Sequence, residues 1–170
     1  MPLHLHKKMD TKLSVRQIQL ALYNFTPLFN KRSDTMATNI SWGLLNHEAD
    51  FVSMNRSGYL TEVEIKRSWE DFKADFKKNH GHKDEKVYRF FYCVPKGILE
   101  KVKDFLIEKF PKNSDRPAVL YYTEQGCIGI EKIGIAYTTK GRKLFIEEQL
   151  QLAKLSAKRF WKLLEQEYLK

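Results

Sequence analysis

Cysteine is scarce in this chain, which has only Cys93 and Cys127 among its 170 residues. The two lie far apart and form no C-x-x-C pair, so the sequence disfavours both a zinc ribbon and a disulfide-stapled scaffold. Such sparing use of cysteine is typical of proteins in reducing compartments. We therefore expect a cytoplasmic protein.

Long apolar runs are also missing. No stretch approaches the roughly 20 apolar residues of a membrane helix, and the opening MPLHLHKKMD lacks the apolar core of a signal peptide. There is no internal repeat, no low-complexity tract and no nucleotide-binding P-loop. These absences predict no membrane partner and favour one domain over residues 1–170.

The chain is rich in apolar residues and carries a net positive charge. Hydrophobic residues make up 42% and aromatic residues 13% of the sequence, which is enough for a real core. The net charge of +9 suggests a polyanionic partner, most simply nucleic acid. A merely soluble basic protein remains the alternative at this point.

The spacing of apolar residues predicts an α/β fold with a mixed sheet. Ser14 and Gln17 are spaced as a capping box at the start of a helix that ends before Pro27, and the polar stretch 30–39 is expected to be a loop. The expected strands are 49–55, 59–66, 86–95, 118–123 and 133–139, with helices after Ser68, over 98–110 and, as a long last element, over 141–170. The core is thus expected over 12–140.

One predicted strand carries an unusual set of charges. Glu62, Glu64 and Lys66 alternate with apolar residues and so share one face of the strand. Asp50 lies 14 residues before Glu64, on the partner strand of a hairpin. Two carboxylates suit Mg²⁺ or Mn²⁺, and a neighbouring lysine suits phosphodiester hydrolysis. The alternative is a solvent-exposed strand face with a Glu–Lys pair.

Asp50 followed by Glu64-Ile65-Lys66 resembles the signature of the PD-(D/E)xK nuclease superfamily. More narrowly, EADF, LTEVEIKRSWEDFKADFKK and YRFFYCVPKGI are similar to the MmcB-like group of DNA repair proteins, over about residues 48–130. The resemblance implies a restriction-endonuclease-like core, a mixed central sheet flanked by helices, and catalytic Asp50, Glu64 and Lys66. Ala49 stands where the family motif has proline, and Glu48 is the nearest candidate for a further catalytic carboxylate.

The same resemblance implies a cofactor and contacts with DNA. Mg²⁺ or Mn²⁺ would be held by Asp50, Glu64 and Ile65. Contacts to DNA are assigned to Lys73, Lys77, Lys78 and Ser68, although Ser68 also suits a helix cap. Asp71 and Asp75 are expected to be solvated charges, His47 could reach the site, and Tyr92 is expected to pack in the core.

The sequence therefore predicts a metal-dependent DNA endonuclease that acts in DNA repair or processing. A non-catalytic DNA-binding or scaffold protein on the same fold is the second hypothesis, and a purely structural charged strand is the third. DNA is the expected partner, while a homodimer and a DNA-repair protein partner remain open. Lys66→Ala is expected to abolish cleavage and leave folding intact.

Overall fold

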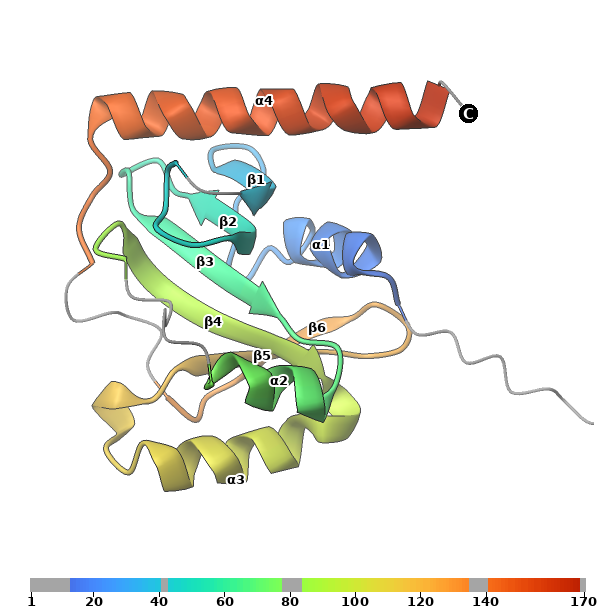
Figure 1. Cartoon of the computed structure of the whole chain (residues 1–170), viewed down its shortest axis with the longest axis vertical. Coiled ribbons are helices and arrows are strands. Elements are labelled where there is room, and N and C mark those ends of the chain that lie inside the picture. Colours follow the sequence, from blue (N-terminus) through green and yellow to red (C-terminus); the bar gives the residue numbers. More distant parts are fainter. Residues whose placement is uncertain (1–12, 41–42, 78–83, 135–140, 169–170) are drawn as a thin grey trace, which may run out of the picture.

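A six-stranded sheet organises the chain, whose computed structural model describes residues 13–40, 43–77, 84–134 and 141–168 (Figure 1). The strands lie in the sheet in chain order. β1, β2 and β3 are antiparallel, β3, β4 and β5 are parallel, and β6 returns antiparallel to β5. Their bounds are Thr35–Ile40, Ala49–Met54, Leu60–Ile65, Val87–Pro95, Ala118–Tyr122 and Ile128–Glu131.

Four α-helices complete the described fold. α1 spans Val15–Tyr23, α2 Trp69–Asp75, α3 Leu99–Lys109 and α4 Ile146–Tyr168. α2 and α3 are the crossovers that parallel strands require, from β3 to β4 and from β4 to β5. Short 3₁₀ turns precede and follow α3, at Lys96–Ile98 and Asn113–Asp115.

The sheet is buried on both faces. One face packs against α2 and α3, where Phe72, Val102 and Leu106 meet the strands. The other face packs against α1 through Ile18 and Leu22. Because β3 lies in the middle of this sheet, all six of its residues are buried, charged ones included. Buried charge is costly unless it is paired, so the charges of β3 must have partners inside the fold.

Local sequence signals account for the helix starts. Ser14 and Gln17 form the predicted capping box, in which each side chain binds the other's main-chain amide. Ser68 caps α2 by accepting from the amide of Asp71 at 3.1 Å. The Asp71 side chain accepts from the amide of Arg67 instead of returning to Ser68, so only half of a capping box forms here.

Two predicted elements differ from the structure. The stretch 30–39, expected to be a loop, contains most of β1, an edge strand whose polar residues hid it. The last strand was expected at 133–139, but β6 lies at Ile128–Glu131 and residues 133–134 form a bend. Residues 135–139 lie outside the described ranges. The mixed α/β sheet and the long last helix are confirmed.

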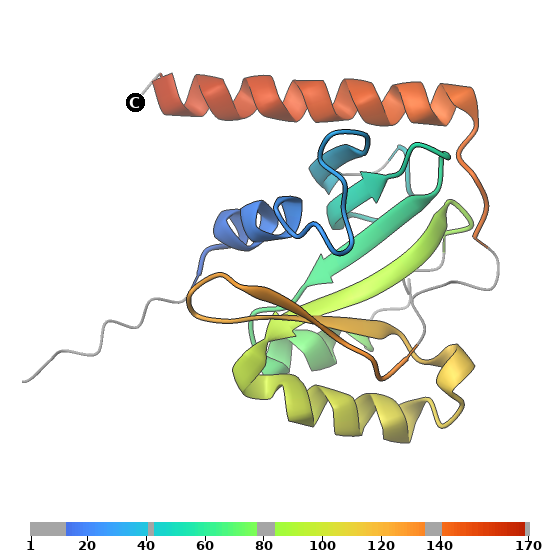
Figure 2. The same cartoon turned by 180° about the vertical axis from the view of Figure 1, so that it is seen from behind.

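α4 lies along the β1 edge of the sheet, away from α2 and α3 (Figures 1 and 2). Arg142 fixes its start by a two-pronged pair with Glu148, both bonds at 2.8 Å, and by a 2.9 Å bond to Glu85. Leu152 of α4 is fully buried. No helix in the described part of the chain is apolar over a length that would cross a membrane.

Candidate active site

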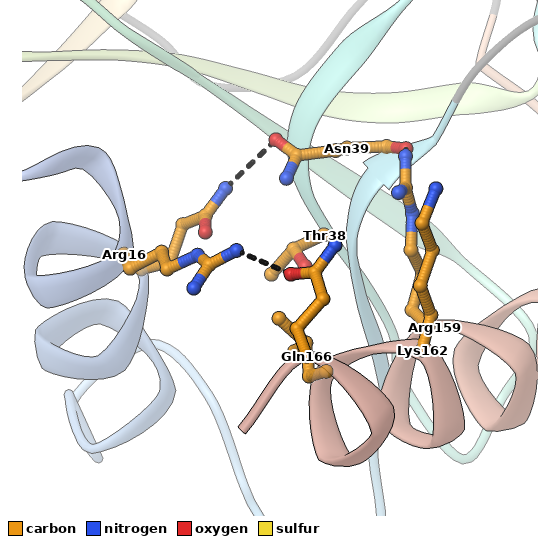
Figure 3. Close-up of a pocket in the computed structure, with 8 residues that line it drawn as sticks. Arg16, Thr38, Asn39, Arg159, Lys162 and Gln166 are labelled. Atoms are coloured by element: carbon orange, nitrogen blue, oxygen red, sulfur yellow. Dashed lines mark hydrogen bonds between the residues drawn. The ribbon is translucent and has the colours of Figure 1, made fainter. Parts of the chain in front are cut away.

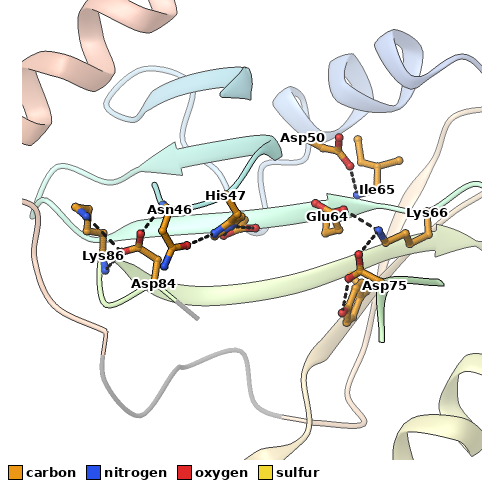
Figure 4. A network of polar contacts seen from close by, with 11 residues as sticks. Asn46, His47, Asp50, Glu64, Ile65, Lys66, Asp75, Asp84 and Lys86 are labelled. Carbon is orange, nitrogen blue, oxygen red and sulfur yellow. Dashed lines mark hydrogen bonds and ion pairs between the residues drawn. The ribbon is translucent and has the colours of Figure 1, made fainter. Parts of the chain in front are cut away.

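A buried charged cluster lies where β3 ends (Figure 4). The ammonium of Lys66 donates to Glu64 Oε1 at 2.7 Å and to Asp75 Oδ1 at 2.9 Å. The hydroxyl of Tyr92 donates to the other oxygen of Asp75 at 2.9 Å. Lys66, Glu64 and Asp75 are 3%, 7% and 6% exposed. The cluster therefore joins the end of β3 to α2 and to β4.

Lys66 is a cation in this setting. Burial is the largest single influence and lowers its pKa, but the charges and hydrogen bonds of Glu64 and Asp75 together outweigh burial. The resulting pKa lies above the usual value of a lysine. Lys66 thus offers positive charge and N–H donors at neutral pH and has no lone pair with which to accept a proton.

Asp50 approaches the same strand end from β2. Its Oδ2 accepts from the amide of Ile65 at 2.8 Å, so its carboxylate is held against the backbone between Glu64 and Lys66 (Figure 4). Gln19 of α1 donates to the main-chain oxygen of Asp50 at 2.9 Å and supports this position from behind. The main-chain pairing of β2 with β3 stops at Phe51 and Val63. Beyond that pair, the Ile65 amide donates to the side chain of Asp50 and not to a main-chain oxygen of β2.

Burial is the main reason that the pKa of Asp50 is raised above its usual range. The Ile65 amide and Lys66 lower it, and the charges of Glu48 and Asp71 raise it again. Glu48 is therefore within electrostatic range of Asp50, as its candidate role requires, although its own side chain is exposed.

Asp50→Asn is expected to make the protein more stable at pH 7. A pKa that is raised in the folded state favours the native protein below the unfolded value of about 4, and this contribution is lost as pH rises through the folded pKa. Asparagine avoids the penalty for a buried charge and can still accept from the Ile65 amide.

Melting temperatures measured from pH 3 to pH 8 would check this expectation. The gap between Asp50→Asn and wild type should open as pH rises and close near pH 3, with Glu48→Gln as an exposed control. A gap that is independent of pH, or a less stable variant at pH 7, would contradict the assigned cause.

A second polar cluster lies farther back on the same face of the sheet. His47 Nε2 contacts both oxygens of Glu62, at 2.8 and 2.9 Å, and His47 Nδ1 contacts the Asn46 side chain at 2.7 Å. Asp84 accepts from the amides of Asn46 and Lys86, both at 2.9 Å. The histidine that could reach the site is thus bound to Glu62.

The structure also places the residues assigned to the metal and to DNA. The side chain of Ile65 is buried among apolar residues, so Ile65 could offer a metal only its main-chain oxygen. Ser68 is the cap of α2. Lys73 and Lys77 are exposed on and just after α2, with the ammonium of Lys73 5.3 Å from the centre of the Trp69 ring. Lys78 lies outside the described residues.

The prediction for Asp75 was wrong. This residue was expected to be solvated, yet it is buried and binds both Lys66 and Tyr92. The available signal was its spacing: Asp75 follows the buried Phe72 by three residues and therefore lies on the apolar side of α2. Tyr92 packs in the core as expected, and burial raises the pKa of its hydroxyl, which stays a neutral donor to Asp75.

The carboxylates at this strand end are hard oxygen donors, the kind that Mg²⁺ and Mn²⁺ prefer. Within the described ranges, no three His, Cys, Asp or Glu side chains are arranged to hold a metal ion. Mg²⁺, however, is commonly held by one or two carboxylates together with water and substrate phosphate. Asp50 and Glu64 supply two carboxylates, and the bond from Ile65 uses only part of the acceptor capacity of Asp50.

Fold and site together define a mixed α/β domain with a carboxylate–lysine cluster at the end of a central strand. No family model matches the chain, and the search of curated proteins found no significant match. Among solved structures, the SPO1766 protein of unknown function from Silicibacter pomeroyi is similar with a TM-score of 0.50 and 18% identity, over 79% of this chain and 80% of that one. This likeness shows the fold alone.

Proposed function

We propose that this chain is a Mg²⁺- or Mn²⁺-dependent DNA endonuclease of the PD-(D/E)xK type that acts in DNA repair or processing. The observation that carries the proposal is the bond from the Ile65 amide to Asp50, which holds one carboxylate against the same strand end that carries Glu64 and Lys66. The element order around it supports the proposal. The family resemblance implied the order helix, strand hairpin, helix, strand, and α1, the β2–β3 hairpin, α2 and β4 follow that order, with β1 as an additional strand before the hairpin.

Each residue of the cluster then has a role. Asp50 and Glu64 would hold the cation, which when bound lowers the pKa of a coordinated water and neutralises phosphate charge. Lys66 would place a fixed positive charge beside the scissile phosphate, where negative charge develops during hydrolysis. Glu64 and Asp75 raise the pKa of Lys66, which suits it to orient and stabilise the phosphate through its positive charge. Asp75 and Tyr92 position Lys66 from behind.

A non-catalytic DNA-binding protein on the same fold is the second candidate. One specific observation favours it: Lys66 is already bound by two carboxylates and is almost fully enclosed. Lys66 must therefore give up part of its interaction with Glu64 before it can contact a phosphate. The basic surface implied by the +9 charge serves either candidate.

The deciding experiment is cleavage of labelled linear, nicked, branched and single-stranded DNA in Mg²⁺, in Mn²⁺ and in chelator. The expected result is cutting of at least one substrate that chelator stops. Salt-sensitive binding to DNA without any cutting would instead favour the non-catalytic protein.

A further inference from the structure

A small basic pocket lies between α1, β1 and α4 (Figure 3). Its volume is about 130 Å³, enough for a small anion or several waters. Figure 3 shows the labelled side chains that surround it: Arg16, Thr38, Asn39, Arg159, Lys162 and Gln166.

The electrostatics of this basic pocket are one-sided. Three of the side chains that line it are cationic, and none of the described lining residues is acidic. Arg16 stands in the first turn of α1, which carries no acidic residue. Helix N-termini are themselves positive and normally favour negative side chains. Arg16, Arg159 and Lys162 thus repel one another and the helix end, and an anion would relieve that repulsion.

Both guanidinium groups are held in place by the protein. Arg159 donates to the main-chain oxygen of Asn39, and Arg16 donates to the side-chain oxygen of Gln166 at 2.9 Å. A guanidinium has five N–H donors, so one such bond fixes its direction and leaves other donors for a ligand. Planar groups fixed in this way suit the oxygens of a phosphate.

The basic pocket is tied structurally to the candidate active site. Gln19 donates to the Asn39 side chain at 3.0 Å and to the main-chain oxygen of Asp50 at 2.9 Å. One glutamine thus joins the pocket wall to the strand that carries Asp50. Lys154, Lys158 and Lys162 recur every four residues and form a row along α4 that ends at the pocket.

We propose that the basic pocket binds a phosphate group of the nucleic acid, at a distance from the phosphate that is cut. The choice of nucleic acid as the ligand rests on the proposed function, whereas the binding test does not require the protein to cut DNA. The phosphate could belong to the continuous backbone or to a free end, and a comparison of substrates separates these two sources.

The test is equilibrium binding of labelled duplex DNA in chelator, so that no cleavage is needed. Arg16→Gln with Lys162→Gln should weaken binding about tenfold and lower the dependence on salt by about one released ion, since roughly 0.9 ions are released per phosphate contact. The matched control is Lys101→Gln with Lys112→Gln, two exposed lysines of the α3 side. Equal losses in both double variants, or none in either, would overturn the proposal.

Two further arms identify the phosphate and separate the inference from the proposed function. A loss confined to 5′-phosphorylated DNA assigns the pocket to a free end, and a loss on all duplexes assigns it to the backbone. If the pocket variant binds weakly while wild type cuts no DNA, the phosphate site in the pocket is supported and the proposed nuclease activity is contradicted. If wild type cuts DNA and both double variants bind it equally well, only the proposed phosphate site in the pocket is contradicted.

A different observation concerns the outer side of α4. The sequence groups Ala153, Ala157, Phe160, Leu164 and Tyr168 on one side of this helix, but that is not the side that packs on the sheet. Leu152 is buried, and Ser156 donates to the main-chain oxygen of Met36 at 2.7 Å. The other side stays open: Ile146 is 72%, Leu150 54% and Phe160 58% exposed. Large exposed apolar patches mark interaction sites.

This outer stripe has the spacing of a coiled-coil seam. Its members follow one another by four, three, four, three and four residues: Ile146, Leu150, Ala153, Ala157, Phe160 and Leu164. The stripe is also symmetric about residue 155, with two small alanines at the centre and two large residues at each end. An antiparallel second copy would place Leu150 against Phe160 and Ala153 against Ala157, which is the self-complementarity that a two-fold interface needs.

We infer that the outer stripe binds a second copy of this chain, with the two α4 helices antiparallel. Sedimentation should show a concentration-dependent dimer, and Leu150→Lys with Phe160→Lys should raise its dissociation constant at least about 30-fold. Leu20→Lys is the matched control, because Leu20 is a leucine of α1 that is 61% exposed. A monomer at every concentration, or equal effects of both changes, would overturn the inference.

Cysteine cross-linking tests the orientation. In a background without the exposed Cys127, Ala153→Cys mixed with Ala157→Cys should give a disulfide between the two different chains. Cross-linking of Ala153→Cys with itself would show a parallel pair and would overturn the antiparallel arrangement.

Discussion

Glu64→Gln is expected to slow metal-dependent DNA cleavage by more than about 100-fold while the protein stays folded. Residues that only orient metal ligands are worth about 10- to 100-fold, so the loss of a ligand should cost more. The substitution preserves the shape of the side chain, and the amide oxygen can still accept the 2.7 Å bond from Lys66. What it removes is the negative charge that attracts a divalent cation.

Glu62→Gln is a demanding control for this result. Glu62 has the same side chain on the same face of the same strand and is fully buried, but it is bound to His47. Its neutralisation should change the cleavage rate far less than that of Glu64. Mg²⁺ should also raise the melting temperature of the wild type and not of Glu64→Gln, because a ligand stabilises only the state that binds it. Unimpaired cleavage by Glu64→Gln would remove Glu64 from the site.

The elements that the sequence predicted well are those in which burial dictates the pattern. β3 and β4 could be found because apolar residues mark them, and α1 and α2 because Ser14 and Ser68 are visible caps. β1 could not be found in the same way. It lies at the edge of the sheet, where a strand needs fewer apolar residues, and half of its sequence TMATNI is polar.

The candidate site was predictable in part for a similar reason. The hairpin fixed Asp50 near Glu64, since antiparallel pairing follows from the short turn between β2 and β3. Asp75 depends on how α2 crosses the sheet, and that crossing is set by tertiary packing such as the contacts of Phe72 and Phe76 with Tyr92. The outward side of α4 was equally hidden, because spacing along a helix groups residues on a face without saying which face meets the sheet.

The cluster around Lys66 changes what its substitution should do. From the sequence, Lys66→Ala was expected to leave folding intact. In the structure, this change would leave two buried carboxylates, Glu64 and Asp75, without the cation that pairs with them. Removal of one partner from a buried ion pair costs about 3–5 kcal/mol. We therefore expect Lys66→Ala to lower the free energy of unfolding by about that amount, with urea denaturation at neutral pH as the measurement.

Arg67→Ala is the matched control, because Arg67 is the next residue and is exposed, so its loss should change stability by less than about 1 kcal/mol. A triple variant, Lys66→Met with Glu64→Gln and Asp75→Asn, should recover much of the lost stability, since replacing a whole buried ion cluster by neutral groups is often harmless. Stability of Lys66→Ala equal to that of Arg67→Ala would contradict the buried cluster. If the triple variant is stable and still fails to cut DNA, the missing cleavage reflects lost chemistry in a folded protein, and the active-site assignment then rests on function rather than on collapse of the fold.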